Sequence, residues 1–329
     1  MKKKLKSAVL LLAVVLILGA ILFYPWSYAI SSPGIAEELA GMVKIPGHSG
    51  EKPGKLYLTT VFFERANLFF FLLAQFFPPY ELTSLKSEAI EDFGFYNRYM
   101  KIQMDESKLF ARVAALRFLG YKIDFKPRGV RIYHFLPRTR ARGILKVGDV
   151  IVKVDECPTP TISALTSYLE KLSPGEKVKL QVQRKGKELL LSVPLISYKG
   201  RTIIGFQPRM EYEVGELPVS INIDAGVISG ASAGLMFALE IIRQLSDEPL
   251  TYWKVAGTGT ISPEGEVGEV DGVEYKIITA RKKSADIFLL PEKNIRDIAR
   301  KDWKIKLIPV NTLSGAVEKL RALNRVKHL

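Results

Sequence analysis

The stretch GVISGASAGLMFALEII, from Gly226 to Ile242, decides how the C-terminal part of this chain is interpreted. It sets Ser232 among very small residues, directly before a run that is apolar on nearly every side. Such a run predicts a helix that begins near Ser232 and is buried inside a domain. Free N–H groups at the first turn, with the backbone freedom of Gly230 and Gly234, favour negative charge beside the serine hydroxyl.

A serine nucleophile needs a base, and the chain has few histidines to supply one. The three are His48, His134 and His328, and only the last, in the C-terminal tail, lies in the segment that carries Ser232. A serine-histidine triad would therefore have to recruit its base from another domain or from that tail.

Lysine is the alternative base. The segment DGVEYKIITARKK, from Asp271 to Lys283, predicts a helix after the Asp271-Gly272 turn, with Lys276 on its apolar face. Burial and a nearby helix N-terminus both penalise the ammonium form, so the pKa of Lys276 is expected below the free value of about 10.4. A neutral lysine can take the proton of Ser232.

These segments resemble, in order and spacing, the proteolytic domain of Lon-type serine-lysine peptidases. The resemblance rests on GASAG at 230–234, TGTI at 258–261, DGVEYK ending at Lys276, and the DIFLLP strand that follows. It implies an α/β (α+β) fold in which Ser232 is the nucleophile, Lys276 the general base and Thr258 the residue that orients the lysine. The turn and oxyanion residues implied are Gly230, Ala231, Ala233 and Gly234.

Two positions depart from that family's pattern. Ala231 stands where proline is common, and Ser229 stands where many members carry an acidic residue. Asp224 is near enough in sequence to line the cleft, but a structural role at a strand end is the favoured interpretation. No GxxxxGK[ST] signature occurs in the chain, so ATP-independent cleavage of extended segments is expected.

Residues 122–196 are predicted to form a small β-rich module. It contains GVRIYHFL, GILKVGDVIVKVD, a helix over TISALTSYLEKL, and a strand pair that turns at Lys185-Gly186. The module resembles bacterial PDZ domains, above all over Leu145–Ile151. The resemblance implies a peptide groove between the strand after Gly129 and the helix that begins near Ile162. The peptide-binding residues expected from it are Arg128, Gly129, Val130, Arg131 and Ile132.

Several arginines crowd this part of the module: Arg128, Arg131, Arg138, Arg140 and Arg142. They fit the capture of an acidic segment or of a terminal carboxylate. A solvated basic face explains them equally well.

The N-terminus predicts one transmembrane helix. Four lysines precede a stretch that carries no charge from Ser7 until Glu37 is reached, with an apolar run over 8–26. Tyr24, Trp26 and Tyr28 fall where aromatic side chains sit at the headgroup level, and the lysines mark the cytoplasmic end. Residues 1–30 are thus expected to be a cytoplasmic tail and cell-membrane anchor, with the catalytic domain extracytoplasmic. A signal peptide cut near Ser27-Tyr28-Ala29 is the competing interpretation.

Taken whole, the chain resembles bacterial membrane-anchored PDZ and Lon-like peptidases. Residues 31–121, with a predicted strand over 55–63 and helices over 65–77 and 106–120, are expected to belong to the peptidase fold. The PDZ domain is then inserted in that fold or precedes it. Residues 200–325 are expected to form the peptidase domain, with strands over 253–261, 286–291 and 304–310 and helices over 292–300 and 312–323.

The composition limits the classes of partner that are expected. The formal net charge is +14, and for an outward-facing protein it favours anionic lipid headgroups or wall polymers over nucleic acid. One cysteine, Cys157, excludes an internal disulfide framework and clustered-thiol metal sites, and no cofactor or metal is expected. Peptide or protein substrates are the expected partners, and the resemblance adds homo-oligomeric rings.

Two other functions stay open at this stage. One is a non-catalytic PDZ peptide-binding scaffold on an inactive Lon-like fold. The other treats Gly226, Gly230 and Gly234 as an anion cradle for a phosphate ligand, although the strand-loop-lysine pattern of such sites is missing.

Overall fold

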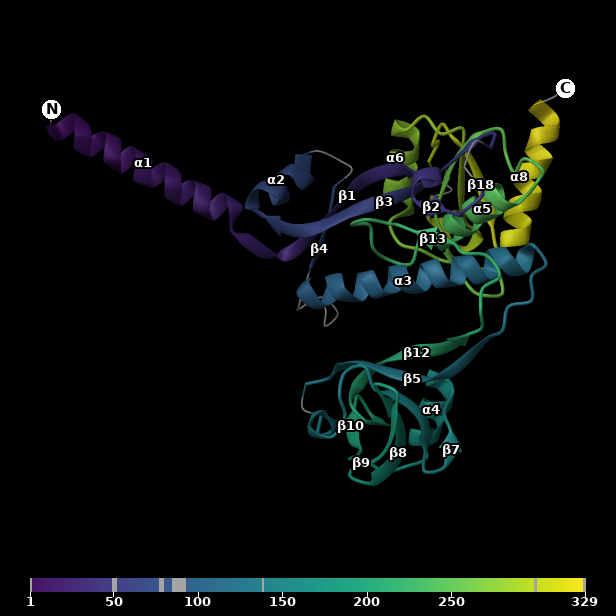
Figure 1. Ribbon diagram of the computed structural model, residues 1–329. Helices are drawn as coiled ribbons and strands as arrows, with labels where there is room; N and C mark the ends of the chain where they lie inside the picture. The colour runs from purple at the N-terminus through teal and green to yellow at the C-terminus, as the bar shows by residue number, and fades with distance from the viewer. Residues whose placement is uncertain are drawn as a thin grey trace. The chain divides into compact units, whose positions relative to one another are not determined.

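The computed structural model describes residues 2–48, 52–76, 80–84, 93–137, 139–298 and 301–327. It divides into two compact units (Figure 1). Unit 1 combines Met1–Lys122 with Pro218–Leu329, and unit 2 is Ile123–Leu217. Unit 2 is therefore inserted in the sequence of unit 1.

Unit 1 is built on a mixed six-stranded sheet in the order β18-β17-β14-β3-β1-β4. The strands β3, β14, β17 and β18 run parallel to one another, whereas β1 runs antiparallel to both β3 and β4. All five residues of β17 are buried, as the unbroken apolar run IFLLP favours for a strand covered on both faces. The bounds are β1 Pro25–Glu38, β3 Lys55–Asn67, β4 Glu81–Ser84, β14 Lys254–Gly257, β17 Ile287–Pro291 and β18 Lys306–Val310.

The central helix of unit 1 is α5, Gly234–Leu245, in which every residue from Gly234 to Gln244 is buried. Its apolar surface packs against the long helix α3, Phe93–Phe118, and against α8, Leu313–Lys327. The helix α6, Val273–Lys282, packs on β1 and β3. The smaller elements are η1 Leu39–Gly41, η3 Glu292–Asn294, α7 Ile295–Ile298, and the strand pairs β2 Val43–Lys44 with β13 Asn222–Ile223 and β15 Thr260–Ile261 with β16 Val267–Gly268.

The N-terminal part of the chain differs from the prediction in two respects. The first helix, α1, covers Lys2–Phe23, and the sequence enters strand β1 already at Pro25, inside the predicted anchor. Among the residues that the structure describes, no helix has the length and hydropathy needed to cross a membrane, so the predicted transmembrane helix is not confirmed. The second helix, α2, is Leu68–Phe76 and follows β3 directly.

Unit 2 is a six-stranded antiparallel sheet in the order β12-β5-β6-β8-β9, with β7 paired to β6, packed around its own apolar core. Lys185 and Gly186 form the predicted turn between β8 and β9, both with positive φ, as a two-residue hairpin turn of type I′ requires. The elements are β5 Phe125–Phe135, β6 Val150–Val154, β7 Cys157–Pro158, β8 Lys177–Arg184, β9 Lys187–Pro194, β10 Ile196–Tyr198, β11 Arg201–Ile203, β12 Phe206–Val214, η2 Ala141–Gly143 and α4 Ile162–Leu169.

Because of strand β12, the boundary between the two units lies later in the sequence than predicted. It pairs antiparallel with β5 along its whole length, from Phe206 opposite Phe135 to Val214 opposite Phe125. The inserted unit thus ends at Leu217, and residues 200–217 lie outside the peptidase unit to which the sequence assigned them.

Candidate active site

Ser232 lies in the turn that leads into α5. The helix itself begins at Gly234, and Ala233 is its N-cap residue, so Ser232 precedes the first helical turn by two residues. The turn is shaped by Gly230, whose φ of +99° strongly favours glycine. Its N–H donates to the carbonyl of Met100 on α3 at 2.8 Å, which fixes the turn against that helix.

Lys276 meets Ser232 directly. The Nζ atom of Lys276 donates to Ser232 Oγ at 3.0 Å and to Thr258 Oγ1 at 3.1 Å. Lys276 lies in the first turns of α6, on the buried face that also carries Val273, Ile277 and Ala280, as its sequence pattern predicts. The structure therefore brings together the three side chains that the sequence selected, from three separate elements.

Burial changes the acid–base behaviour of Lys276. Lys276 is 4% exposed, and burial lowers the pKa of its amine from 10.5 to about 8, while the charge of Asp271 has a smaller effect in the opposite direction. Desolvation penalises the ammonium form because a low-dielectric interior solvates charge poorly. A substantial fraction of this lysine is thus the neutral amine near pH 8.

The backbone around Ser232 is held from two sides. Its carbonyl accepts from the N–H of Gly259 at 2.9 Å and from Thr258 Oγ1 at 3.1 Å. On the α3 side, Ser107 Oγ donates to the carbonyl of Ala231 at 3.0 Å. Sequence analysis missed Ser107, because no local pattern links it to a turn more than a hundred residues away. A Cβ on Gly234 would meet Ile261 Cγ2 at 2.8 Å and Ser107 Oγ at 3.0 Å, so glycine is needed at this close approach.

The hydrogen bonds of the turn decide which of its N–H groups are available to bind an oxyanion. Those of Gly230 and Gly234 are directed to the carbonyls of Met100 and Ala231. Within the part of the chain that the structure describes, no hydrogen-bond partner is present for the N–H groups of Ser232 and Ala233. The donors beside the hydroxyl are therefore those of Ser232 and Ala233 rather than those of the two glycines.

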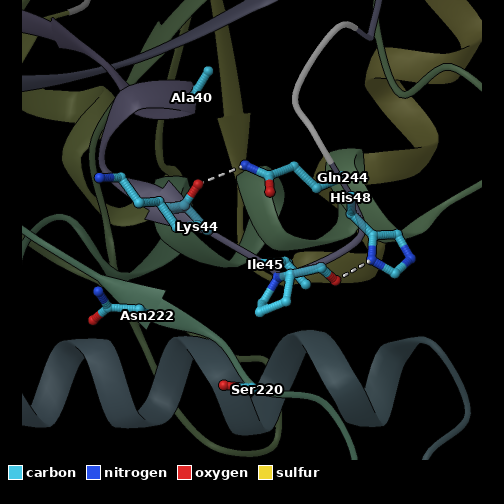
Figure 2. A pocket seen from close by; sticks show the side chains of 9 residues that line it. Ala40, Lys44, Ile45, His48, Ser220, Asn222 and Gln244 are labelled. Carbon is cyan, nitrogen blue, oxygen red and sulfur yellow. Dashed lines mark hydrogen bonds between the residues drawn. The ribbon is translucent and has the colours of Figure 1, made fainter.

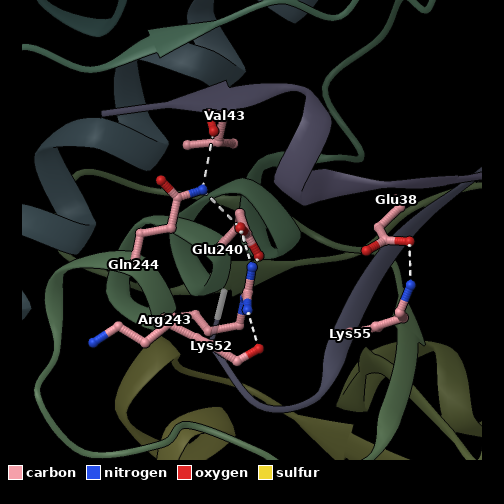
Figure 3. A network of polar contacts seen from close by, with 7 residues as sticks. All are labelled: Glu38, Val43, Lys52, Lys55, Glu240, Arg243 and Gln244. Atoms are coloured by element: carbon pink, nitrogen blue, oxygen red, sulfur yellow. Dashed lines mark hydrogen bonds and ion pairs between the residues drawn. The ribbon is translucent and has the colours of Figure 1, made fainter. Parts of the chain in front are cut away.

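A buried charged cluster anchors the helix that follows the nucleophile (Figure 3). The carboxylate of Glu240 accepts two hydrogen bonds from Arg243, each 2.8 Å, and a third from Gln244 Nε2 at 2.7 Å. Arg243 also donates to the carbonyl of Lys52, and Gln244 to that of Val43. The cluster connects α5 to residues of the N-terminal segment.

Two pockets of similar size lie in unit 1. One, about 350 Å³, is lined by residues from the region of β2, β13 and α5, including Lys44, Asn222 and Gln244 (Figure 2). His48 also lies there, with its Nδ1 3.2 Å from the carbonyl of Pro46. The other, about 340 Å³, includes Ala231 and is bordered by α3 and by the β15–β16 hairpin. Only the second pocket adjoins the residue before Ser232.

The remaining predicted residues of unit 1 have structural contacts. Asp224 Oδ1 accepts from the N–H of Gly226 at 2.9 Å, and its own N–H donates to Met42, in keeping with a role at a strand end. In the described ranges, no group of three His, Cys, Asp or Glu side chains is arranged to hold a metal ion. His328 lies outside the described residues, and Cys157 is an exposed free thiol.

The structure contradicts the predicted position of the peptide groove in unit 2. Strand β5 pairs with β12 on one side and with β6 on the other, so its backbone at Val130 and Arg131 is not a free edge. Val130 and Ile132 are core residues, and a Cβ on Gly129 would meet the Ile151 carbonyl oxygen at 2.5 Å. The edge strand is β12, and α4 contacts both β12 and β5.

Two of the arginines of that region contact neighbouring strands. Arg131 forms a two-pronged ion pair with Glu211 of β12, with both N–O distances 2.6 Å. Arg128 donates to Gln183 on β8. Arg138 lies outside the described residues. The residues from Arg128 to Ile132 therefore take part in cross-strand pairing or contacts, and a role for them in peptide binding stays a prediction.

Comparison with known proteins finds two family matches along the chain. Residues 119–195 match the family model of the PDZ domain, and residues 209–319 match that of the Lon protease (S16) C-terminal proteolytic domain. The Lon protease of Mesomycoplasma hyopneumoniae is 38% identical over 101 residues, which cover 29% of this chain and 11% of that protein. The Archaeal Lon protease of Archaeoglobus fulgidus is 28% identical over 185 residues, covering 54% of this chain and 27% of that protein.

Among solved structures, the PDZ domain of the SdrC-like protein from Listeria innocua is similar to 24% of this chain, with 27% identity, 92% coverage of that domain and a TM-score of 0.23. The chain spans about a tenth to a quarter of the length of the two Lon proteases above. The family matches support a serine peptidase. Residues 119–195 are accordingly similar to PDZ domains, and residues 209–319 are similar to the proteolytic domain of Lon-type proteases.

Proposed function

We propose that this protein is a serine endopeptidase that uses Ser232 and Lys276 as a catalytic dyad. The observation that carries the proposal is the 3.0 Å contact between Lys276 Nζ and Ser232 Oγ, together with the burial that lowers the pKa of the lysine to about 8. An alcohol becomes a useful nucleophile when a neutral base within hydrogen-bond reach can take its proton.

The proposed reaction proceeds in two stages. Neutral Lys276 accepts the Ser232 proton as Oγ attacks the peptide carbonyl, and the oxyanion is bound by the N–H groups of Ser232 and Ala233. The lysine then returns that proton to the leaving amine, which leaves an acyl-serine. A water molecule, deprotonated by the same lysine, hydrolyses the ester and restores the hydroxyl. Thr258 holds the lysine in place through its Oγ1.

The direct test replaces Ser232 by alanine. Ser232→Ala is expected to abolish cleavage of an unfolded protein substrate, while Ser229→Ala is the matched control. Ser229 is an exposed serine three residues earlier in the same loop, so its loss is expected to leave cleavage unchanged. Equal cleavage by wild type and Ser232→Ala would exclude the dyad, whereas peptide binding without any cleavage by the wild type would favour the alternative, a non-catalytic peptide-binding scaffold. If neither the wild type nor Ser232→Ala cleaves the substrate, but both bind inorganic phosphate at the turn with Gly226, Gly230 and Gly234, the anion-cradle alternative is favoured instead.

The PDZ domain is proposed to capture or gate substrates through the edge of β12. Support comes from its place at the end of the sheet and from α4 beside it, where Met210 Sδ of β12 lies 3.3 Å from the N–H of Ile162. An extended peptide can add to such an edge and pair with the exposed backbone groups. A peptide that binds this edge is expected to slow cleavage of a protein substrate by the wild-type chain, and an inhibition assay with that peptide tests this.

The setting of the activity is also proposed. Cleavage is expected without ATP, because no GxxxxGK[ST] signature occurs in this chain. Attachment to a membrane, with both domains outside the cytoplasm, is supported by the four N-terminal lysines and the uncharged stretch that follows them. Protease accessibility of the two domains in intact cells tests that location, and sedimentation of the purified chain tests assembly into rings.

A further inference from the structure

The helix α2 presents an apolar face to solvent. Phe69, Leu72 and Phe76 are spaced so that they share one side of the helix, and they are 43%, 45% and 73% exposed. A helix that faces water normally carries polar or charged residues there. The sequence has no charged residue between Arg65 and Glu81, so the described exposed face of α2 has nothing to hydrate it well.

The opposite side of α2 is already occupied. The ring of Phe71 lies edge-on to Tyr28 of β1, with 6.5 Å between ring centres, and α2 also contacts β3 and β4. The helix is therefore attached to the ribbon formed by β1 and β3, and the face with Phe69, Leu72 and Phe76 is directed away from it. Figure 1 shows α2 at the end of this ribbon, next to α1.

The apolar face of α2 continues onto α1. The two helices are in contact, and the rings of Phe23 and Phe69 lie 6.1 Å apart. The described apolar side chains of α1, from Val9 to Phe23, are exposed on consecutive positions such as Leu10, Leu11 and Leu12. A helix that pairs with a second copy buries one apolar stripe, and its other sides are polar. A helix surrounded by lipid is instead apolar on all sides.

We infer that α2 inserts its Phe69, Leu72 and Phe76 face into the interfacial layer of a lipid bilayer beside α1. At about 1.5 Å per residue its nine residues are about 14 Å long, so α2 enters one leaflet and does not cross the bilayer. Aromatic side chains favour the headgroup boundary, and the net charge of +14 favours anionic lipids. The inference rests on the proposed membrane attachment of the chain.

This attachment also limits where the peptidase can act. Strand β3 runs from its pairing with β14, at Leu58, to the start of α2, which is roughly 30 Å along an extended strand. Thr258 follows the end of β14 directly. The dyad is therefore kept near the lipid surface, where polypeptides close to the membrane are its substrates.

The test places one fluorescent probe at each of three exposed leucines of the full chain. In a Cys157→Ser background, the variants Leu72→Cys (α2), Leu16→Cys (α1) and Leu190→Cys (β9 of the PDZ domain) are labelled with an environment-sensitive dye. The proteins are reconstituted in vesicles of phosphatidylcholine and phosphatidylglycerol with a spin-label quencher on the acyl chains. The expected result is a blue shift and loss of emission at positions 72 and 16, with no change at position 190.

Other outcomes overturn the inference in distinguishable ways. Quenching at position 16 without quenching at position 72 would leave membrane attachment intact and exclude α2 from lipid. Energy transfer between labelled copies at position 72, without lipid quenching, would identify a second copy as the occupant. No quenching at either position would remove the proposed attachment as well. None of these readouts depends on peptidase activity, so loss of cleavage by Ser232→Ala stands as a separate test.

Discussion

The Nζ atom of Lys276 lies 3.0 Å from the Oγ atom of Ser232, although the lysine is almost wholly buried. A buried amine is costly to protonate, so the same burial that destabilises the ammonium supplies a base for the serine. The arrangement depends on long-range structure, because α6, the turn before α5 and the residue after β14 each contribute one side chain.

The pH profile of cleavage is expected to respond to Asp271. Burial lowers the pKa of the Lys276 amine to about 8, and the negative charge of Asp271 opposes that effect. Cleavage therefore rises with pH as the amine loses its proton around pH 8. Asp271→Asn removes the opposing charge and is expected to shift the rising limb to lower pH. Glu274→Gln is the control, because that carboxylate is paired with Lys301 at 2.7 Å. An unchanged profile in Asp271→Asn would show that this charge does not reach the base.

Stability is expected to increase when the lysine is replaced by an apolar side chain. The pKa of Lys276 is about 8 in the folded chain and 10.5 ordinarily, so the unfolded chain binds more protons between these values. The free energy of unfolding of the wild type thus rises with pH between about 8 and about 10.5. Below pH 8 the wild type is destabilised by the full cost of burying the charged amine. One pKa unit corresponds to about 1.4 kcal/mol, so removing this cost in Lys276→Met is expected to raise the free energy of unfolding at pH 7 by roughly 3 kcal/mol.

Urea unfolding of the wild type and of Lys276→Met at pH 7 and above pH 10.5 checks this sign. The difference between the two proteins is expected to shrink as the pH rises. A difference that is constant with pH would mean that the lysine keeps its ordinary pKa in the folded chain.

Thr258 is expected to act by positioning the lysine. Its Oγ1 accepts from Lys276 Nζ and donates to the carbonyl of Ser232, so it fixes both members of the dyad. Thr258→Val removes both hydrogen bonds at nearly constant shape and is expected to lower kcat by about 10- to 100-fold, the equivalent of about 1–3 kcal/mol. Thr258→Ser keeps the hydroxyl and is expected to restore most of the rate. Equal rates in both variants would contradict a role for the hydroxyl.

The buried pair of Glu240 and Arg243 is expected to matter far more for stability than an exposed pair does. Both side chains are almost fully buried, so Glu240→Gln leaves an unpaired guanidinium in the interior and is expected to cost about 3–5 kcal/mol. Arg131→Met breaks the half-exposed pair with Glu211 and is expected to cost about 1 kcal/mol or less. Denaturant unfolding of the two variants compares these costs. Similar losses in both would show that the Glu240 cluster does not anchor α5.

Local patterns were sufficient to predict the elements that carry the dyad. The buried helix after Ser232, the amphipathic helix with Lys276 and the hairpin turn at Lys185-Gly186 each follow from residues a few positions apart. The contact between the side chains at 232 and 276 was expected from the resemblance to a family. The same holds for the place of Thr258 beside them.

Features that depend on distant partners were not predictable in this way. Ser107 supports the turn from a helix far away in sequence, and nothing around it signals that contact. The edge strand β12 follows the residues that resemble a PDZ domain, so the groove was assigned to β5, which β12 covers. The strand β1 begins within an apolar run, and composition alone did not separate its first residues from α1.

The most direct test of the dyad is the rate at which Ser232 is acylated by a small activated ester, followed across pH. Mass mapping of the trapped acyl-enzyme identifies the modified residue. The expected result is modification of Ser232 at a rate that rises with pH through about 8, and its loss in Lys276→Met. Acylation of Ser232 at an equal rate in Lys276→Met, or of a different residue in the wild type, would contradict the account.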